Sequence, residues 1–185
     1  MSEERDSVRK ELRSRFELRL DERVERSLRS RVHNYIPGEF FSAASSECRD
    51  LFITGHFYGC ISLVQAVSEG IARFAAGKLK LPVVECHRDQ VKILKKEPAL
   101  PWNPRDVFKA FEKIHKDRND FHHLNAAIEQ DWTKLEQRAF DCLEALYKIE
   151  SELFGYSLTD QGMVPNHPAF WPADCPNMLR VHVRS

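Results

Sequence analysis

Apolar residues recur at spacings of three and four along most of this chain, which is the period of an α-helix with one buried face. The clearest case runs from 57 to 77 and predicts the central core helix. Its apolar positions are Phe57, Ile61, Val64, Val67, Ile71 and Phe74. Similar patterns predict helices over 40–52, 85–96 and 103–116, followed by a last long helix that ends near 154.

We expect the last long helix to follow directly on the hexapeptide at 118–123, which would stand at its foot. Its inward-facing residues should be Trp132, Leu135, Ala139, Leu143, Leu146 and Ile149. The boundaries of the other helices are marked by turn residues. Gly55 interrupts the apolar pattern, and Asn103-Pro104 combines a capping side chain with a proline at the first helical position.

No segment alternates apolar and polar residues as a half-buried strand does, and no internal repeat occurs, so the expected fold class is all-α. The chain should divide into a charged amphipathic helix over 1–36, a helical bundle with four core helices over 37–156, and a tail over 157–185. The prolines of the tail predict an irregular course, with Phe170 and Trp171 holding it against the bundle.

The first segment has an apolar residue at every fourth position, surrounded by charge. We call this set the N-terminal stripe; it comprises Val8, Leu12, Phe16, Leu20, Val24, Leu28 and Val32. A step of four residues turns an α-helix by about 400°, so the stripe winds around the helix and fits a heptad coiled coil poorly. We expect one long helix that lies across its own core or against a partner subunit.

Composition favours a globular, cytoplasmic protein. Hydrophobic residues make up 42% and charged residues 30% of the 185 positions, which suits a buried core with a wet surface. We expect no signal peptide, because the charged residues at 1–6 are not followed by an apolar stretch. We expect no membrane partner, because the most apolar region, 57–76, contains Gln65, Glu69 and Arg73. Five cysteines without a CxxC pair indicate free thiols in a reducing compartment.

The net charge is zero, but the charges are unevenly distributed. Residues 78–118 hold 11 Lys and Arg against 6 Asp and Glu, whereas residues 119–160 hold 3 against 9. The hexapeptide at 118–123 lies at this changeover. A basic segment that leads to the motif could attract phosphates, although an ordinary solvated surface can have the same composition.

Arg118, Asn119 and His123 are the candidate functional residues. Arginine is a permanent cation and histidine titrates near neutral pH, so the pair suits phosphoryl chemistry on RNA. A surface arginine and a packing histidine also occur this close together without any function. Five helical positions amount to a net rotation of about 140°, so Arg118 and His123 share a cleft only if the backbone leaves helical geometry or a second subunit supplies one of them.

The other candidate sites are weaker. The adjacent His122 and His123 point in diverging directions, and no carboxylate or cysteine stands at a ligand spacing from the histidines, so we expect neither a metal site nor a cofactor. No glycine-rich phosphate loop occurs. Gln65 and Glu69 lie one helical turn apart and could face a cleft, but solvent is the commoner environment for such residues.

The helix order and the motif of Arg, Asn and a His four residues further along resemble the HEPN superfamily of ribonucleases. The resemblance covers about 40–154 and falls on Arg118, Asn119 and His123, with His122 as the alternative at a shorter spacing. It implies metal-independent cleavage of RNA at a composite site, which forms when two subunits bring their motifs together. Asn125 stands where one HEPN subgroup carries a tyrosine used in silencing by a nucleotidyltransferase, so that mode of regulation is not expected.

The resemblance also implies a role for each motif residue. His123 would accept the proton of a ribose 2′-hydroxyl, Arg118 would hold the phosphate, and Asn119 would orient one of these groups. The products would end in a 2′,3′-cyclic phosphate and a 5′-hydroxyl, and DNA would not be cut.

We therefore expect a homodimeric endoribonuclease with a toxin, defence or stress role, for which an antitoxin or another regulatory protein is a further partner. The alternative is a catalytically silent helical module that binds a partner through the N-terminal stripe.

Overall fold

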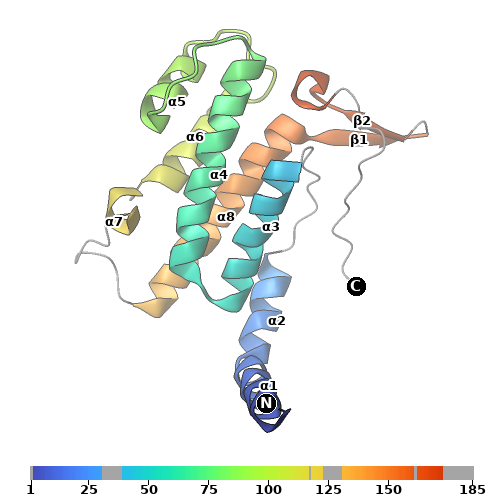
Figure 1. Cartoon of the computed structure of the whole chain (residues 1–185). Helices are drawn as coiled ribbons and strands as arrows, with labels where there is room; N and C mark the ends of the chain where they lie inside the picture. The colour runs from blue at the N-terminus through green and yellow to red at the C-terminus, as the bar shows by residue number, and fades with distance from the viewer. Residues whose placement is uncertain (1, 31–38, 117, 123–130, 161, 173–185) are drawn as a thin grey trace.

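The computed structural model describes residues 2–30, 39–116, 118–122, 131–160 and 162–172 (Figure 1). In this part of the chain, the body of the molecule is a bundle of α3 (Glu39–Thr54), α4 (Phe57–Lys78), α6 (Pro104–His115) and α8 (Trp132–Phe154). α4 packs against each of the other three helices, and α6 and α8 lie side by side. The predicted helical fold class is thus confirmed.

α4 is central because apolar side chains occupy several of its faces. Phe57, Ile61, Val64 and Ile71 are fully buried, as their spacing predicts. The facing residues of α8 are also buried and include Leu143, Leu146 and Ile149. Burial of a side chain of this size contributes roughly 1.5–3 kcal/mol, so these contacts supply much of the driving force for folding.

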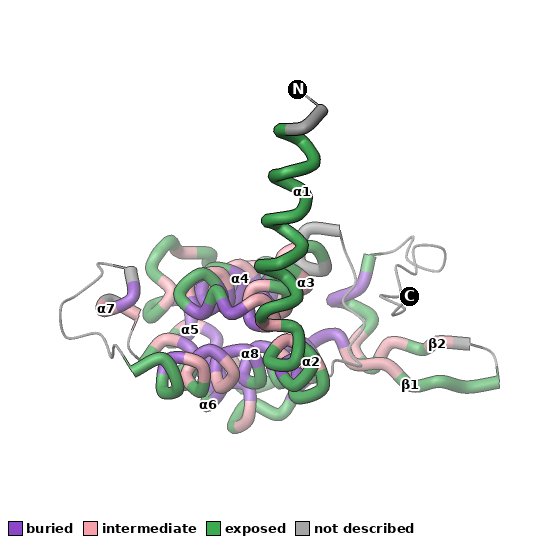
Figure 2. Tube along the Cα trace, turned by 90° about the horizontal axis from the view of Figure 1, so that it is seen from below, coloured by how far each residue is buried: buried purple, intermediate pink, exposed green. Residues whose placement is uncertain are grey.

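The N-terminal segment is two helices, α1 (Ser2–Glu17) and α2 (Leu20–Arg29), and not the single helix expected from its pattern. α1 projects away from the bundle (Figure 2). The described residues of the N-terminal stripe, from Val8 to Leu28, are 42–62% exposed, so the stripe does not lie across the core. Val32 lies outside the described residues.

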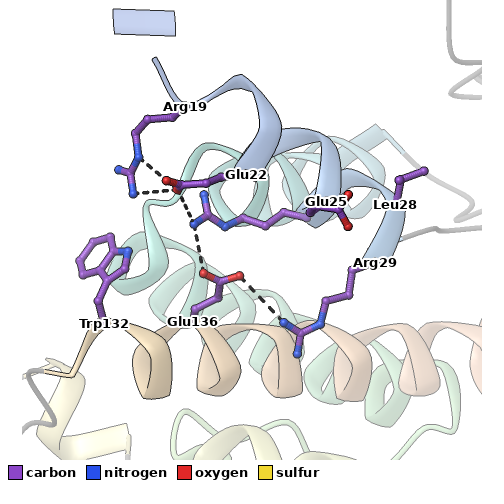
Figure 3. A pocket seen from close by; sticks show the side chains of 8 residues that line it. Arg19, Glu22, Glu25, Leu28, Arg29, Trp132 and Glu136 are labelled. Atoms are coloured by element: carbon purple, nitrogen blue, oxygen red, sulfur yellow. Dashed lines mark hydrogen bonds and ion pairs between the residues drawn. The ribbon is translucent and has the colours of Figure 1, made fainter. Parts of the chain in front are cut away.

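α2 is held to the bundle by a buried arginine instead of by its apolar residues. Nη2 of Arg26 lies 3.0 Å from a carboxylate oxygen of Glu22 and 3.0 Å from one of Glu136 on α8 (Figure 3). Its guanidinium also lies 5.0 Å from the ring centre of Phe57. Gly55 has a φ of +84°, and a Cβ there would stand 3.2 Å from Nη1 of Arg26, so glycine permits both the turn and this close approach. The sequence correctly predicted a break at Gly55.

The tail contains a hairpin that the sequence analysis missed. β1 (Tyr156–Thr159) pairs antiparallel with β2 (Gly162–Pro165), and a short 3-10 helix η1 (Pro168–Phe170) follows. Strands of four residues are too short for an alternating pattern to stand out, and the last three residues of β1 are all exposed. The prediction for the aromatic residues is confirmed, because Phe170 and Trp171 are buried.

The remaining helices are α5 (His87–Lys95) and α7 (Arg118–His122). α7 is a separate short helix, so the motif does not stand at the foot of the last long helix as expected. α8 begins later because Asp131 caps it, accepting a hydrogen bond from the backbone N–H of Thr133 at 2.9 Å. Trp132, which was predicted to face inward, is exposed at this first turn.

None of the helices in the described part of the chain combines the length and the apolar content needed to cross a bilayer.

Candidate functional site

Arg118 is held at the surface by an acidic residue of the central helix. Its Nε lies 3.0 Å from Oε1 of Glu69, and the two side chains are 42% and 13% exposed. The Nε–H does not point at the carboxylate, so the contact is an ion pair without hydrogen-bond geometry. Neither Nη of Arg118 donates a hydrogen bond to any residue that the structure describes. One edge of the guanidinium is therefore anchored, and the fork formed by its Nη groups has no partner in the described part of the chain; we call it the open fork.

Gln65 is buried and Glu69 is largely covered, so of the two environments considered for this pair, solvent, the commoner one, does not apply. Gln65 is fully buried, and its Nε2 donates to the backbone carbonyl of Ile114 at 3.3 Å. The last carbonyls of a helix lack intrahelical donors, and α6 ends at this point. Arg138 of α8 also donates to the carbonyls of Lys113 and Ile114. Polar residues of α4 and α8 thus donate hydrogen bonds to the carbonyl groups at the C-terminus of α6.

Two histidines lie beside this helix end. Nε2 of His115 is 2.9 Å from Oγ of Ser68, and its ring stacks on the ring of His87 with centroids 3.6 Å apart. Burial lowers the pKa of His87 to about 4, with the positive charges of Arg118 and Arg73 as further causes. His87 is therefore neutral at neutral pH.

The side chains around Arg118 come together from four helices. We call them the Arg118 cluster, which comprises Glu69 and Arg73 of α4, His87 of α5, His115 of α6 and Arg118 of α7. No sequence pattern groups these residues, because most of them are distant along the chain and meet only through helix packing. The cluster combines guanidinium groups that can bind an anion with imidazoles beside them.

The other predicted site residues are placed only in part. Asn119 and His122 belong to α7, but their side chains are not among those described, and His123 lies outside the described residues. The proximity of Arg118 and His123 thus stays a prediction. Within the described ranges, no three His, Cys, Asp or Glu residues are grouped so that they could hold a metal ion.

No family model, no curated protein and no solved structure shows a significant match to this chain. The resemblance to HEPN ribonucleases stays a prediction that follows from the motif and the helix order. Function is therefore inferred from side chains and their contacts.

Proposed function

We propose that this chain is a metal-independent endoribonuclease of HEPN type. The observation that carries the proposal is the open fork of Arg118, a side chain that Glu69 anchors on one edge and that is 42% exposed. A guanidinium fork matches two phosphate oxygens through parallel hydrogen bonds. Arg118 is also the first residue of the motif that resembles the HEPN superfamily.

The proposed reaction is a transfer of the phosphodiester to the neighbouring ribose. The 2′-oxygen attacks phosphorus while His123 accepts its proton, the bond from phosphorus to the 5′-oxygen breaks, and the 5′-oxygen takes up a proton. Arg118 stabilises the negative charge on the non-bridging oxygens, and Asn119 orients one of these groups. Two subunits would contribute their motifs to one composite site.

The direct test is cleavage of RNA in excess EDTA, with analysis of the product ends. We expect cyclic phosphate ends and no cleavage of 2′-deoxy substrates. His123→Ala should lose on the order of 10²-fold or more in rate. Arg118→Ala should lose about 10²–10³-fold. His122→Ala should lose much less; a loss as large as that of His123→Ala would show that the shorter spacing, with His122 as the base, is the operative one.

His123→Ala and Arg118→Ala should both keep the helical circular dichroism spectrum of the wild-type protein. Loss of cleavage on chelation alone would contradict the mechanism. Retained cleavage by a folded double variant of His122 and His123 would also contradict it.

A second candidate function is that of a catalytically silent interaction module. The observation that favours it is the exposed N-terminal stripe on α1 and α2. Isolated helices of about 15 residues are marginally stable in water, so α1 would gain from a partner. Light scattering distinguishes the two candidates: if Leu12→Glu changes the oligomeric state while the wild-type protein cleaves no RNA, the interaction module is the better interpretation.

A further inference from the structure

Arg73 and Arg118 contact the same carboxylate from different helices. Nη1 of Arg73 lies 3.8 Å from Oε2 of Glu69, and Nε of Arg118 lies 3.0 Å from Oε1. The two arginine side chains are 38% and 42% exposed, whereas Glu69 is largely covered. The three side chains together carry one net positive charge, and the exposed part of the group is cationic.

The position of Arg73 is fixed by a second contact. Its Nη1 donates to the backbone carbonyl of Glu85 at 3.3 Å, in the segment that leads into α5. Arg73 therefore does not depend on Glu69 alone for its orientation. Both arginines also lie close enough to His87 to lower its pKa, after burial as the largest cause.

This pairing has a consequence for an anion bound by Arg118. Because both guanidinium groups touch one carboxylate, a phosphate on the open fork of Arg118 lies near the charge of Arg73. One phosphate on Arg118 leaves Arg73 available for the next negative charge of a polyanion. Consecutive phosphates are what an RNA strand provides.

We propose that Arg73 binds the RNA phosphate adjacent to the scissile phosphate held by Arg118. The ligand class is then RNA with at least two consecutive charged phosphodiesters, and Arg73 is a binding residue and not a catalytic one. This inference rests on the proposed function, because it takes Arg118 as the ligand of the scissile phosphate.

The first experiment measures binding without cleavage. In a His123→Ala background, a single-stranded RNA oligonucleotide is titrated at several salt concentrations. Arg73→Gln should weaken binding by about tenfold, the scale of a charge-assisted hydrogen bond. It should also reduce the slope of log K against log salt by about 0.7, the value for one contact to single-stranded nucleic acid.

Two further variants control for charge and folding. Arg73→Lys keeps the positive charge, so its slope of log K against log salt should be close to that of the wild-type protein. Arg105→Gln removes the same charge from the exposed first turn of α6, at the opposite end of that helix from the cluster, and should have little effect. Glutamine at 73 keeps a polar side chain on α4 without the positive charge.

The second experiment places one uncharged methylphosphonate linkage beside the scissile phosphate, on its 5′ side in one substrate and on its 3′ side in another. For the wild-type protein, one of the two should raise KM about tenfold. For Arg73→Gln, the same linkage should cause no further rise, because the contact is already lost.

The outcomes separate the two proposals. If the wild-type protein cleaves RNA and neither methylphosphonate shows coupling to Arg73, the inference is wrong and the proposed function stands. Equal effects of Arg73→Gln and Arg105→Gln would also overturn it, since they would indicate general charge attraction. If the wild-type protein neither binds nor cleaves RNA, both proposals fail.

Discussion

Glu69 and Arg118 form an ion pair that connects the central helix α4 to the short helix α7, with 3.0 Å between Oε1 and Nε. The carboxylate is largely covered and the guanidinium is half exposed, so the acidic residue is the fixed partner. Ion pairs with one exposed member contribute only about 0–1 kcal/mol to stability. The contact is better suited to orienting Arg118 than to stabilising the fold.

Glu69→Gln should therefore reduce catalysis more than stability. We expect kcat for RNA cleavage to fall about tenfold, because a misplaced transition-state contact lowers the rate of the chemical step. KM and the unfolding midpoint should change little. The matched control is Glu112→Gln, which removes an exposed carboxylate of α6 that pairs with Lys95. A fall in midpoint large enough to unfold the protein at the assay temperature would show that Glu69 is structural.

The pKa of His87 should report on the charge of Arg118. Arg118→Ala removes one of the two cations that lower this pKa, so the pKa should rise from about 4. Burial is the largest cause of the lowering and is retained, so the value should stay below the ordinary 6.5. Titration of the imidazole proton resonances by NMR measures the change. Arg105→Ala should leave the resonance of His87 unaffected, and an unchanged pKa in Arg118→Ala would place Arg118 away from His87.

The fold and the site differ in how far the sequence could predict them. The periodicity of α4 identified Phe57, Ile61 and Ile71 as core residues because helix burial repeats locally along the chain. The same local rule assigned Glu69 to solvent, since it does not show which residues pack against each face. One of the two described partners of Glu69 comes from α7, far along the chain, and only tertiary packing brings Arg118 to it.

The N-terminal stripe is the opposite case, because its apolar residues from Val8 to Leu28 were predicted to be buried and are exposed. Its apolar spacing predicted burial, yet the helix pair docks through Arg26, which lies between Glu22 and Glu136. A charged residue was not expected as the anchor, because arginines are rarely buried unless they are paired. Glu22 lies one helical turn before Arg26, but Glu136 is distant along the chain, so no local pattern indicates that this ion pair joins α2 to α8.

Glu150 should make the protein less stable at alkaline pH. The side chain is fully buried in α8, and burial raises its pKa to about 8 from an ordinary 4.5, with the Ser45 hydroxyl acting in the opposite sense. The folded state therefore retains a proton that the unfolded state loses. The contribution of this proton is fully present below pH 4.5 and is lost as the pH rises to about 8. The total change is on the order of several kcal/mol.

Urea unfolding at pH 5, 7 and 9 tests this prediction. The free energy of unfolding should fall with rising pH in the wild-type protein and should vary much less in Glu150→Gln, whose amide stays neutral. Glu144→Gln, an exposed substitution on the same helix, should leave the pH dependence unchanged. Identical pH dependence in the wild-type protein and Glu150→Gln would contradict the assignment.

Lys80 has a backbone conformation that glycine would adopt more easily. Its φ is +58°, and it follows the C-terminus of α4, where its N–H donates to the carbonyl of Gly77 and the N–H of Leu81 donates to that of Ala76. This pair of hydrogen bonds defines a Schellman motif, in which the left-handed position is usually glycine. A left-handed L-residue costs roughly 1–2 kcal/mol, and glycine loses part of that gain through its greater freedom in the unfolded chain. Lys80→Gly should therefore raise the free energy of unfolding by about 0.5–1 kcal/mol in chemical denaturation.

The control for this prediction is Lys78→Gly, two residues earlier and inside the last turn of α4. It removes the same charge but should lower the free energy of unfolding by about 1 kcal/mol. Equal signs for the two substitutions would show that the left-handed conformation of Lys80 carries no strain.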